Sequence, residues 1–299
     1  MNNINEIEVL RKRAKNKDLL KNIIVLVLLV LIASCIIIYF FVKTKWAAFA
    51  SYGIFIFAPL LFIFLIYYGF VLSKHIILFE DRYIEELVIK ALKTKFDNLK
   101  YDPSKNYHTI NGALIEMVDA GDRGIVSYNI LGNYKTTTFE YIYIESSYGI
   151  GDNSEERFKG SCMLFKFEKK FKKNIQLVNK KFGYKRYSYQ YENKKQKELY
   201  LKNYNIFAED DDFNNFLTPQ VIDAINKIEN ILKKKIMISF VNQELHVDVM
   251  GGINSFKPKL YKKINDDNMQ TIREYILSDI KPIIELVDIV ISNNNFFED

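Results

Sequence analysis

Two uninterrupted apolar runs dominate the hydrophobic pattern at the start of this chain. Residues 23–42 and 46–72 contain no Asp, Glu, Lys, Arg or His. A bilayer core is crossed by about 20 helical residues, so each run predicts a membrane-spanning helix. Only Lys43, Thr44 and Lys45 separate the runs, and the chain must therefore cross, turn and cross back. We predict a basic arm followed by a two-helix transmembrane hairpin over residues 1–75.

A helical period follows the second run. Apolar residues recur every three to four positions from Ile76 to Phe96, with acidic and basic residues between them. This spacing is typical of an amphipathic helix. We predict a connecting helix over residues 76–100, ended by Tyr101, Asp102 and Pro103, because the residue before a proline is biased away from the helical conformation.

The pattern then changes to that of β-strands, between about residues 107 and 178. Segments 124–128, 136–144 and 161–167 are rich in β-branched and aromatic residues and are separated by turns containing Gly and Asn. Short strands with tight connections favour an antiparallel sheet.

The C-terminal part predicts a strand, a helix, a hairpin and a final helix. Residues 204–208 are extended, and a helix capped by Thr218, with Pro219 at its first position, continues to about Lys233. Residues 236–241 and 244–250 form a hairpin, and residues 266–291 form the closing helix. The fold class is therefore α+β, with a transmembrane hairpin followed by a cytosolic domain over residues 101–299.

The positive charges beside the apolar runs predict the orientation. Lys and Arg remain on the cytoplasmic side of a membrane. The turn between the runs holds only two basic residues, whereas the opposite side holds Arg11, Lys12, Arg13, Lys15, Lys17, Lys21, Lys74 and Arg82. We predict a multi-pass protein of the inner (cytoplasmic) membrane with both termini in the cytoplasm.

Residues 32–35, Ile-Ala-Ser-Cys, offer an alternative in which Cys35 is the lipidated first residue of a lipoprotein. Residues 36–42 remain apolar and a second run follows, whereas a mature lipoprotein usually begins with a polar tether. We therefore favour the hairpin. Cys35 then lies in the membrane and Cys162 in the soluble part, so the two cysteines cannot form a bridge within one molecule.

One segment is strongly basic although the formal net charge of the chain is only +6. Residues 157–202 contain fifteen Lys or Arg against three Glu. Near an anionic leaflet each Lys or Arg contributes about 1 kcal/mol. The candidate residues for binding anionic lipid or a partner protein are Lys169, Lys170, Lys172, Lys173, Lys180, Lys181, Lys185 and Arg186. Aromatic residues interleaved over 182–191 also suit stacking on single-stranded nucleic acid, and a solvated lysine-rich face is the alternative to both.

Several short motifs together resemble a bacterial family. They are Phe158-Lys159-Gly160, residues 205–210 (Asn-Ile-Phe-Ala-Glu-Asp) and Leu217-Thr218-Pro219, which follow two N-terminal spans. With this arrangement the chain is similar, over nearly its whole length, to the bacterial membrane family catalogued as domain of unknown function 3137. The resemblance implies the architecture without an activity, and it implies a LemA-type membrane protein as a partner.

The sequence predicts no cofactor and no metal site. His75, His108 and His246 have no Cys or carboxylate at ligand spacing. An enzyme remains the alternative if dispersed carboxylates converge in a pocket, the candidates being Glu116, Asp119, Asp122 and Asp248. We predict instead a binding or scaffolding module at the membrane surface. The lipid bilayer is its first expected partner, and the oligomeric state is left open.

Overall fold

The structure is a computed structural model, and it describes residues 3–41, 45–103, 123–148, 155–182, 193–194, 201–208 and 216–298. The predicted residues Glu116, Asp119, Asp122, Lys185 and Arg186 lie outside these ranges. The chain divides into two compact units. Unit 1 contains residues 1–86 and 258–269, and unit 2 contains residues 87–257 and 270–299.

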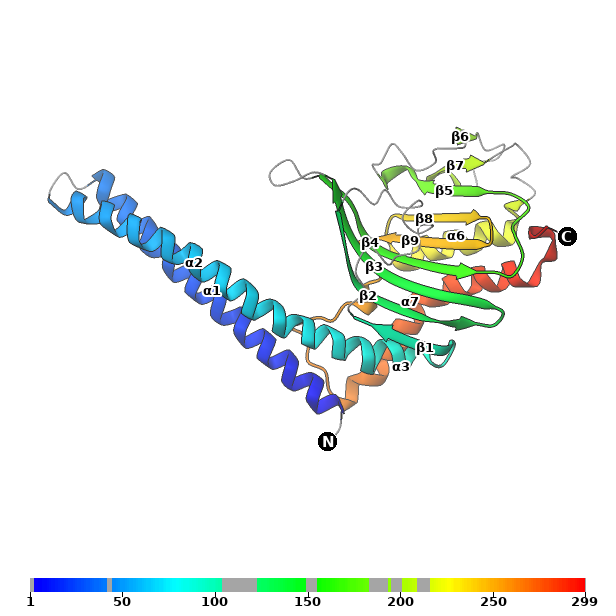
Figure 1. The fold of residues 1–299 in the computed structure, drawn as a ribbon, viewed down its shortest axis with the longest axis horizontal. Coiled ribbons are helices and arrows are strands. Elements are labelled where there is room, and N and C mark those ends of the chain that lie inside the picture. The colour runs from blue at the N-terminus through cyan, green and yellow to red at the C-terminus, as the bar shows by residue number, and fades with distance from the viewer. Residues whose placement is uncertain are drawn as a thin grey trace. The chain divides into compact units, whose positions relative to one another are not determined.

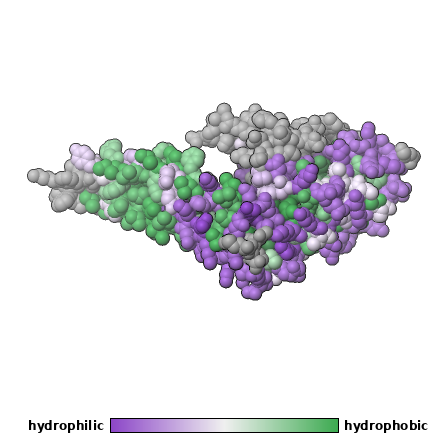
Figure 2. Space-filling view, turned by 60° about the horizontal axis from the view of Figure 1, so that its bottom comes forward, coloured by the Kyte–Doolittle hydropathy of each residue, from purple (hydrophilic) through white to green (hydrophobic). Residues whose placement is uncertain are grey.

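Unit 1 is built on two long helices, α1 (Asn3–Phe41) and α2 (Lys45–Tyr83). Both are long and apolar enough to cross a membrane. Their apolar side chains are exposed, for example Phe40 at 69%, Phe55 at 78% and Phe70 at 76%, and Figure 2 shows this apolar surface as a continuous area over the helices. A soluble monomer rarely exposes so large an apolar patch, so unit 1 is that of a membrane protein.

The two helices pack closely where Gly53 of α2 faces Cys35 of α1. A Cβ atom added at Gly53 would lie 2.7 Å from the Cys35 Sγ atom. Small residues allow membrane helices to approach each other in this way. Cys35 is a half-buried free thiol within α1.

The predicted connecting helix is too long. Beyond α2 the chain forms a π-helical turn, η1 (Ile84–Ile89), and a short helix, α3 (Lys90–Leu92). Residues 97–100, predicted as the end of the helix, belong instead to strand β1 (Asp97–Asp102). Asn98, at the start of this strand, has a positive φ of 53°. Backbone pairing with a distant strand, β2, outweighs the helical period here.

Unit 2 contains one antiparallel sheet with the strand order β1-β2-β3-β4-β9-β8-β5-β7-β6 among the described residues. Its long strands are β2 (Arg123–Tyr134), β3 (Thr137–Tyr148) and β4 (Glu155–Lys166). The shorter ones are β5 (Ile175–Asn179), β6 (Asn193–Lys194), β7 (Tyr204–Ala208), β8 (Ile236–Val241) and β9 (Glu244–Met250). The predicted antiparallel sheet and the α+β class are confirmed.

Helices α6 (Pro219–Leu232) and α7 (Asp266–Ser292) lie on one side of this sheet (Figure 1). Both were predicted almost to the residue, as was the β8–β9 hairpin. Thr218 caps α6 as predicted, because its Oγ1 atom accepts a hydrogen bond from the Val221 amide at 3.4 Å.

Short 3-10 turns complete unit 2, namely η4 (Lys180–Phe182), η6 (Asn254–Phe256) and η7 (Asn294–Phe296). An aromatic cluster joins the C-terminal turn to the sheet. Phe216, before α6, packs on Phe240 of β8 with ring centroids 4.9 Å apart and on Phe296 at 4.7 Å. The bridge between Phe171 and Phe297 ties the end of the chain to the connection between β4 and β5.

Candidate functional site

The predicted basic residues fall into two groups at opposite ends of β5. Lys169, Lys170 and Lys172 are exposed in the connection between β4 and β5, where Lys173 is half-buried. Lys180 and Lys181 are exposed after β5. A five-residue strand is about 17 Å long at 3.3 Å per residue, so the described lysines form two small groups rather than one cluster.

Asp248, one of the predicted dispersed carboxylates, belongs to a buried polar region of the sheet. Residues directly opposite each other in paired strands point to the same face. One such row runs from Met237 through Asp248, Cys162 and Ile142 to Asn129. The adjacent row runs through the buried residues Gln176, Ser239, His246, Leu164 and Glu140.

Asp248 is the more deeply buried of the two carboxylates in these rows, the other being Glu140. It is 0% exposed, and neither of its carboxylate oxygens has a hydrogen-bond partner among the described residues. Burial raises its pKa to about 6, and His246 opposes this shift. Burial also raises the pKa of the Cys162 thiol, and the Asp248 charge adds to that effect.

His246 lies in the same buried region, closer than Asp248 to the turn of the β8–β9 hairpin. Its Nε2 atom lies 3.2 Å from the Glu244 Oε2 atom, and this hydrogen bond lowers the pKa of Glu244. Asn129 donates to the Glu140 Oε1 atom at 2.9 Å. A reactive cysteine needs a depressed pKa. Because the pKa of Cys162 is raised, its thiol stays protonated and is not an activated nucleophile.

No group of three or more metal-ligating side chains comes together within the described parts of the chain. Cys162 of β4 and His246 and Asp248 of β9 lie on neighbouring strands of the buried rows, but they do not form such a group. The sheet therefore offers isolated polar groups rather than an assembled metal centre in these residues.

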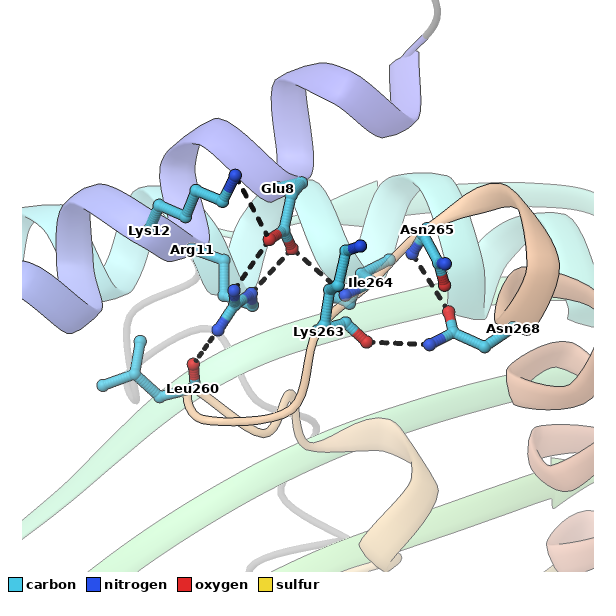
Figure 3. A network of polar contacts seen from close by, with 8 residues as sticks. All are labelled: Glu8, Arg11, Lys12, Leu260, Lys263, Ile264, Asn265 and Asn268. Carbon is cyan, nitrogen blue, oxygen red and sulfur yellow. Dashed lines mark hydrogen bonds and ion pairs between the residues drawn. The ribbon is translucent and has the colours of Figure 1, made fainter.

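A second polar site lies in unit 1, where α1 contacts the segment before α7 (Figure 3). Arg11 forms a forked pair with Glu8, each of the two N···O distances being 2.7 Å. The same guanidinium donates to the Leu260 carbonyl at 2.7 Å, and the Ile264 amide donates to Glu8 at 3.1 Å. We call these four residues the basal contact.

The basal contact is buried. Arg11 is 4% and Glu8 9% exposed, and the neighbouring Ile7 and Ala14 are fully buried. The hydrogen bond from Arg11 lowers the pKa of Glu8. Forked pairs between Arg and carboxylate hold their partners in a fixed geometry, so the basal contact sets the position of residues 258–265 on α1.

Beyond the basal contact, Tyr261 extends the same interface along α1. Its hydroxyl bonds to the Asp18 carboxylate, and the Lys15 Nζ atom lies 5.8 Å from the centroid of its ring. Lys21 pairs with Asp18 at 3.6 Å. The sequence pattern indicates only an orienting role for the basic arm. It does not reveal Lys259, Tyr261, Lys262 and Lys263, because no local pattern links residues this distant in the chain.

The architecture defines a class, a protein with two helices apolar enough to cross a membrane and an α+β domain. Residues 156–290 match the family model described as "Protein of unknown function (DUF3137)", so this part of the chain is similar to that family. The predicted motifs at Phe158–Gly160 and Leu217–Pro219 both lie inside the match. The match begins in β4, so the matched region is shorter than the predicted resemblance.

Among solved structures, the mycobacterial trehalose monomycolate transport factor A, TtfA, is similar to this chain. The TM-score is 0.38 at 9% sequence identity, over 69% of this chain and 95% of that chain. A comparison with curated proteins found no match.

Proposed function

We propose that this protein is a two-pass inner-membrane protein whose cytosolic α+β domain is a binding or scaffolding module at the membrane surface. The observation that carries the proposal is the change of surface along α1. Arg11, Lys12, Arg13, Lys15, Lys17 and Lys21 precede the uncharged apolar run that begins at Ile23. Charged side chains at that position favour the cytoplasmic side for the N-terminus.

The return of the chain from unit 2 to unit 1 supports a scaffolding role. The chain passes between unit 1 and unit 2 after residue 86, before residue 258 and after residue 269. Residues 258–265 are in addition held to α1 by the basal contact. A segment fixed on α1 in this way gives unit 1 a defined surface beside the predicted membrane span, as a surface module requires.

The exposed lysines on either side of β5 are the proposed contact for a partner. Lys169, Lys170, Lys172, Lys180 and Lys181 extend from unit 2 without belonging to its core. Charged side chains of this kind raise association rates with acidic surfaces. A LemA-type membrane protein, implied by the family resemblance, is one partner that the experiment below can identify.

Cysteine labelling tests the topology. In a background carrying Cys35→Ala and Cys162→Ala, a membrane-impermeant thiol reagent should label Thr44→Cys in intact cells. It should label Asn294→Cys only after the membrane is opened. Labelling of the Asn294→Cys protein in intact cells would place the domain outside and overturn the proposal.

Co-purification tests the binding role. The full-length protein, extracted in mild detergent, should retain a stable protein partner that mass spectrometry identifies. Changing Lys169, Lys170 and Lys172 to Gln should reduce its recovery. Recovery of a tightly bound nucleotide or metal in place of a protein would contradict the scaffold and favour the enzyme.

A further inference from the structure

Residues 258–265 are fixed on α1 rather than free between a strand and a helix. The basal contact holds the backbone at two points, the Leu260 carbonyl and the Ile264 amide. Asn268 then closes the segment, because its side chain donates to the Lys263 carbonyl at 2.8 Å and accepts from the Asn265 amide at 3.1 Å (Figure 3). The side chains between these points are thereby given a defined position along α1.

That position is the level at which α1 enters the membrane. Tyr261 contacts Lys15 and Asp18, which precede Ile23 by eight and five residues. At 1.5 Å per residue this is about 8–12 Å along the helix axis. The polar layer on each side of a bilayer core is about 5–8 Å thick, so the Tyr261 ring lies at the outer border of the headgroups.

The side chains at this level are mostly basic and accessible. Lys259, Lys262 and Lys263 are exposed, and Tyr261 is 56% exposed. Residues 3–21 and 258–265 together carry nine Lys or Arg against Glu6, Glu8 and Asp18, a formal charge of +6. Asp266 and Asp267 follow this segment in the sequence and begin α7.

The carboxylates at this level are already engaged. Glu8 is held by Arg11 and by the Ile264 amide, and Asp18 by Lys21 and the Tyr261 hydroxyl. Neither acid can neutralise the exposed lysines of the segment without giving up these contacts. The positive charge of Lys259, Lys262 and Lys263 therefore faces solvent or headgroups.

We propose that residues 259–263, with Lys15 and Lys17 of α1, form a binding site for the headgroups of anionic phospholipids. Lysine ammonium groups would pair with phosphate, and the Tyr261 ring suits the interface, where tyrosine is enriched. This inference deepens the proposed function and rests on it, since it requires α1 to span the bilayer from Ile23. It moves the lipid contact from the predicted segment 157–202 to the base of the hairpin.

The first experiment measures lipid preference with the full-length protein in nanodiscs containing equal amounts of phosphatidylglycerol and phosphatidylcholine. Native mass spectrometry would count the lipids retained after release. We compare Lys259→Gln/Lys262→Gln/Lys263→Gln with a matched control, Lys233→Gln/Lys235→Gln/Lys281→Gln, at exposed lysines without a proposed binding role. Both variants remove three exposed lysines, so net charge and fold are affected equally.

The preference for phosphatidylglycerol should fall about tenfold or more in the Lys259→Gln/Lys262→Gln/Lys263→Gln variant and should persist in the control. It should also weaken as salt rises. An unchanged preference in the first variant, or an equal loss in both, would overturn the site.

A second experiment reports the depth of Tyr261 directly. Trp46 is the single tryptophan of the chain, so Trp46→Phe/Tyr261→Trp carries one fluorophore at the proposed site. A quencher on the lipid headgroup should quench it strongly, and more so on an anionic headgroup. An unquenched fluorophore in a protein whose cysteines label as proposed would overturn the lipid site and leave the membrane topology standing.

Discussion

Some buried polar residues of the sheet lower the stability of the folded state, and other contacts of the fold must offset this loss. Asp248 is the clearest case, since a buried carboxylate without hydrogen-bond partners disfavours its ionised form. Its folded-state pKa of about 6 exceeds its ordinary value of 3.8. Between these values the folded state binds more protons than the unfolded state, so stability falls as pH rises, by at most about 3 kcal/mol.

Asp248→Asn should therefore stabilise the full-length protein in detergent at pH 7.5, by on the order of 1–3 kcal/mol. Denaturant titrations followed by near-ultraviolet circular dichroism would measure this. The gain should shrink as the pH falls through 6 and toward about 3, because below the ordinary pKa of 3.8 the aspartate is mostly protonated in both states. Asp223→Asn, at a side chain 64% exposed, is the control and should change little. A less stable Asp248→Asn protein at pH 7.5 would contradict the argument.

Gly160, in the Phe-x-Gly motif, has a steric reason to be glycine. A Cβ atom there would overlap the Val249 carbonyl oxygen and lie 2.7 Å from the Phe158 ring. Gly160→Ala should cost about 1–3 kcal/mol through overpacking between β4 and β9. Thermal unfolding would show the loss. Gly69→Ala should show no loss, because nothing lies within 4 Å of the added Cβ apart from the neighbouring backbone of its own helix. Equal stability of both variants would be evidence against the close approach at Gly160.

At the scale of an element, the start of α6 shows how a short motif sets a boundary. Thr218 has an extended backbone, its hydroxyl oxygen accepts from the Val221 amide, and Pro219 occupies the first helical turn, where its missing amide hydrogen costs nothing. Lys233 ends the helix in the left-handed conformation, at φ 51°. The Leu-Thr-Pro motif thus sets the start of α6 through interactions within the first turn of the helix.

Thr218→Ala should destabilise the domain by about 0.5–2 kcal/mol, because one amide of the first turn loses its partner. Chemical denaturation of the full-length protein in detergent would detect this change. Thr218→Ser keeps the hydroxyl and should retain most of the stability. If alanine and serine proved equivalent, the hydroxyl would have no capping role.

For the whole molecule, the basal contact is the place where distant parts of the chain of unit 1 meet. Arg11 and Leu260 are separated by 249 positions, yet their atoms lie 2.7 Å apart. Removing one partner of a buried pair leaves the other charge without compensation, at a cost of about 3–5 kcal/mol. The docking of residues 258–265 should therefore depend on Arg11.

Arg11→Met should release the backbone of this segment, so that trypsin can cleave after the already exposed Lys259, Lys262 and Lys263. Cleavage at these sites should accelerate about tenfold or more, since proteolysis follows local opening. Peptide mapping over time in detergent would measure the rate. Arg13→Met removes an exposed basic residue two positions away and should leave it unchanged. Equal rates in the two variants would mean that the segment is held elsewhere.

Local patterns determined much of the fold from sequence alone. The two apolar runs, the α6 start at Thr218, the β8–β9 hairpin and α7 each follow from propensity and periodicity within a few neighbouring residues. The same local reasoning failed for residues 97–100, where pairing with β2 converted a helical period into β1. It included residues up to 178 in the β region but did not single out β5, which lies between β8 and β7 in the sheet.

The tertiary structure alone decided which side chains meet. Cys162 and Asp248 are neighbours only because β4 pairs with β9, and Glu8 and Ile264 only because the chain returns to α1. Such contacts depend on register and long-range packing, and a sequence records neither of these in its local pattern. The apolar runs and basic arm were therefore evident from the sequence, whereas the headgroup-level lysines at 259–263 required the fold.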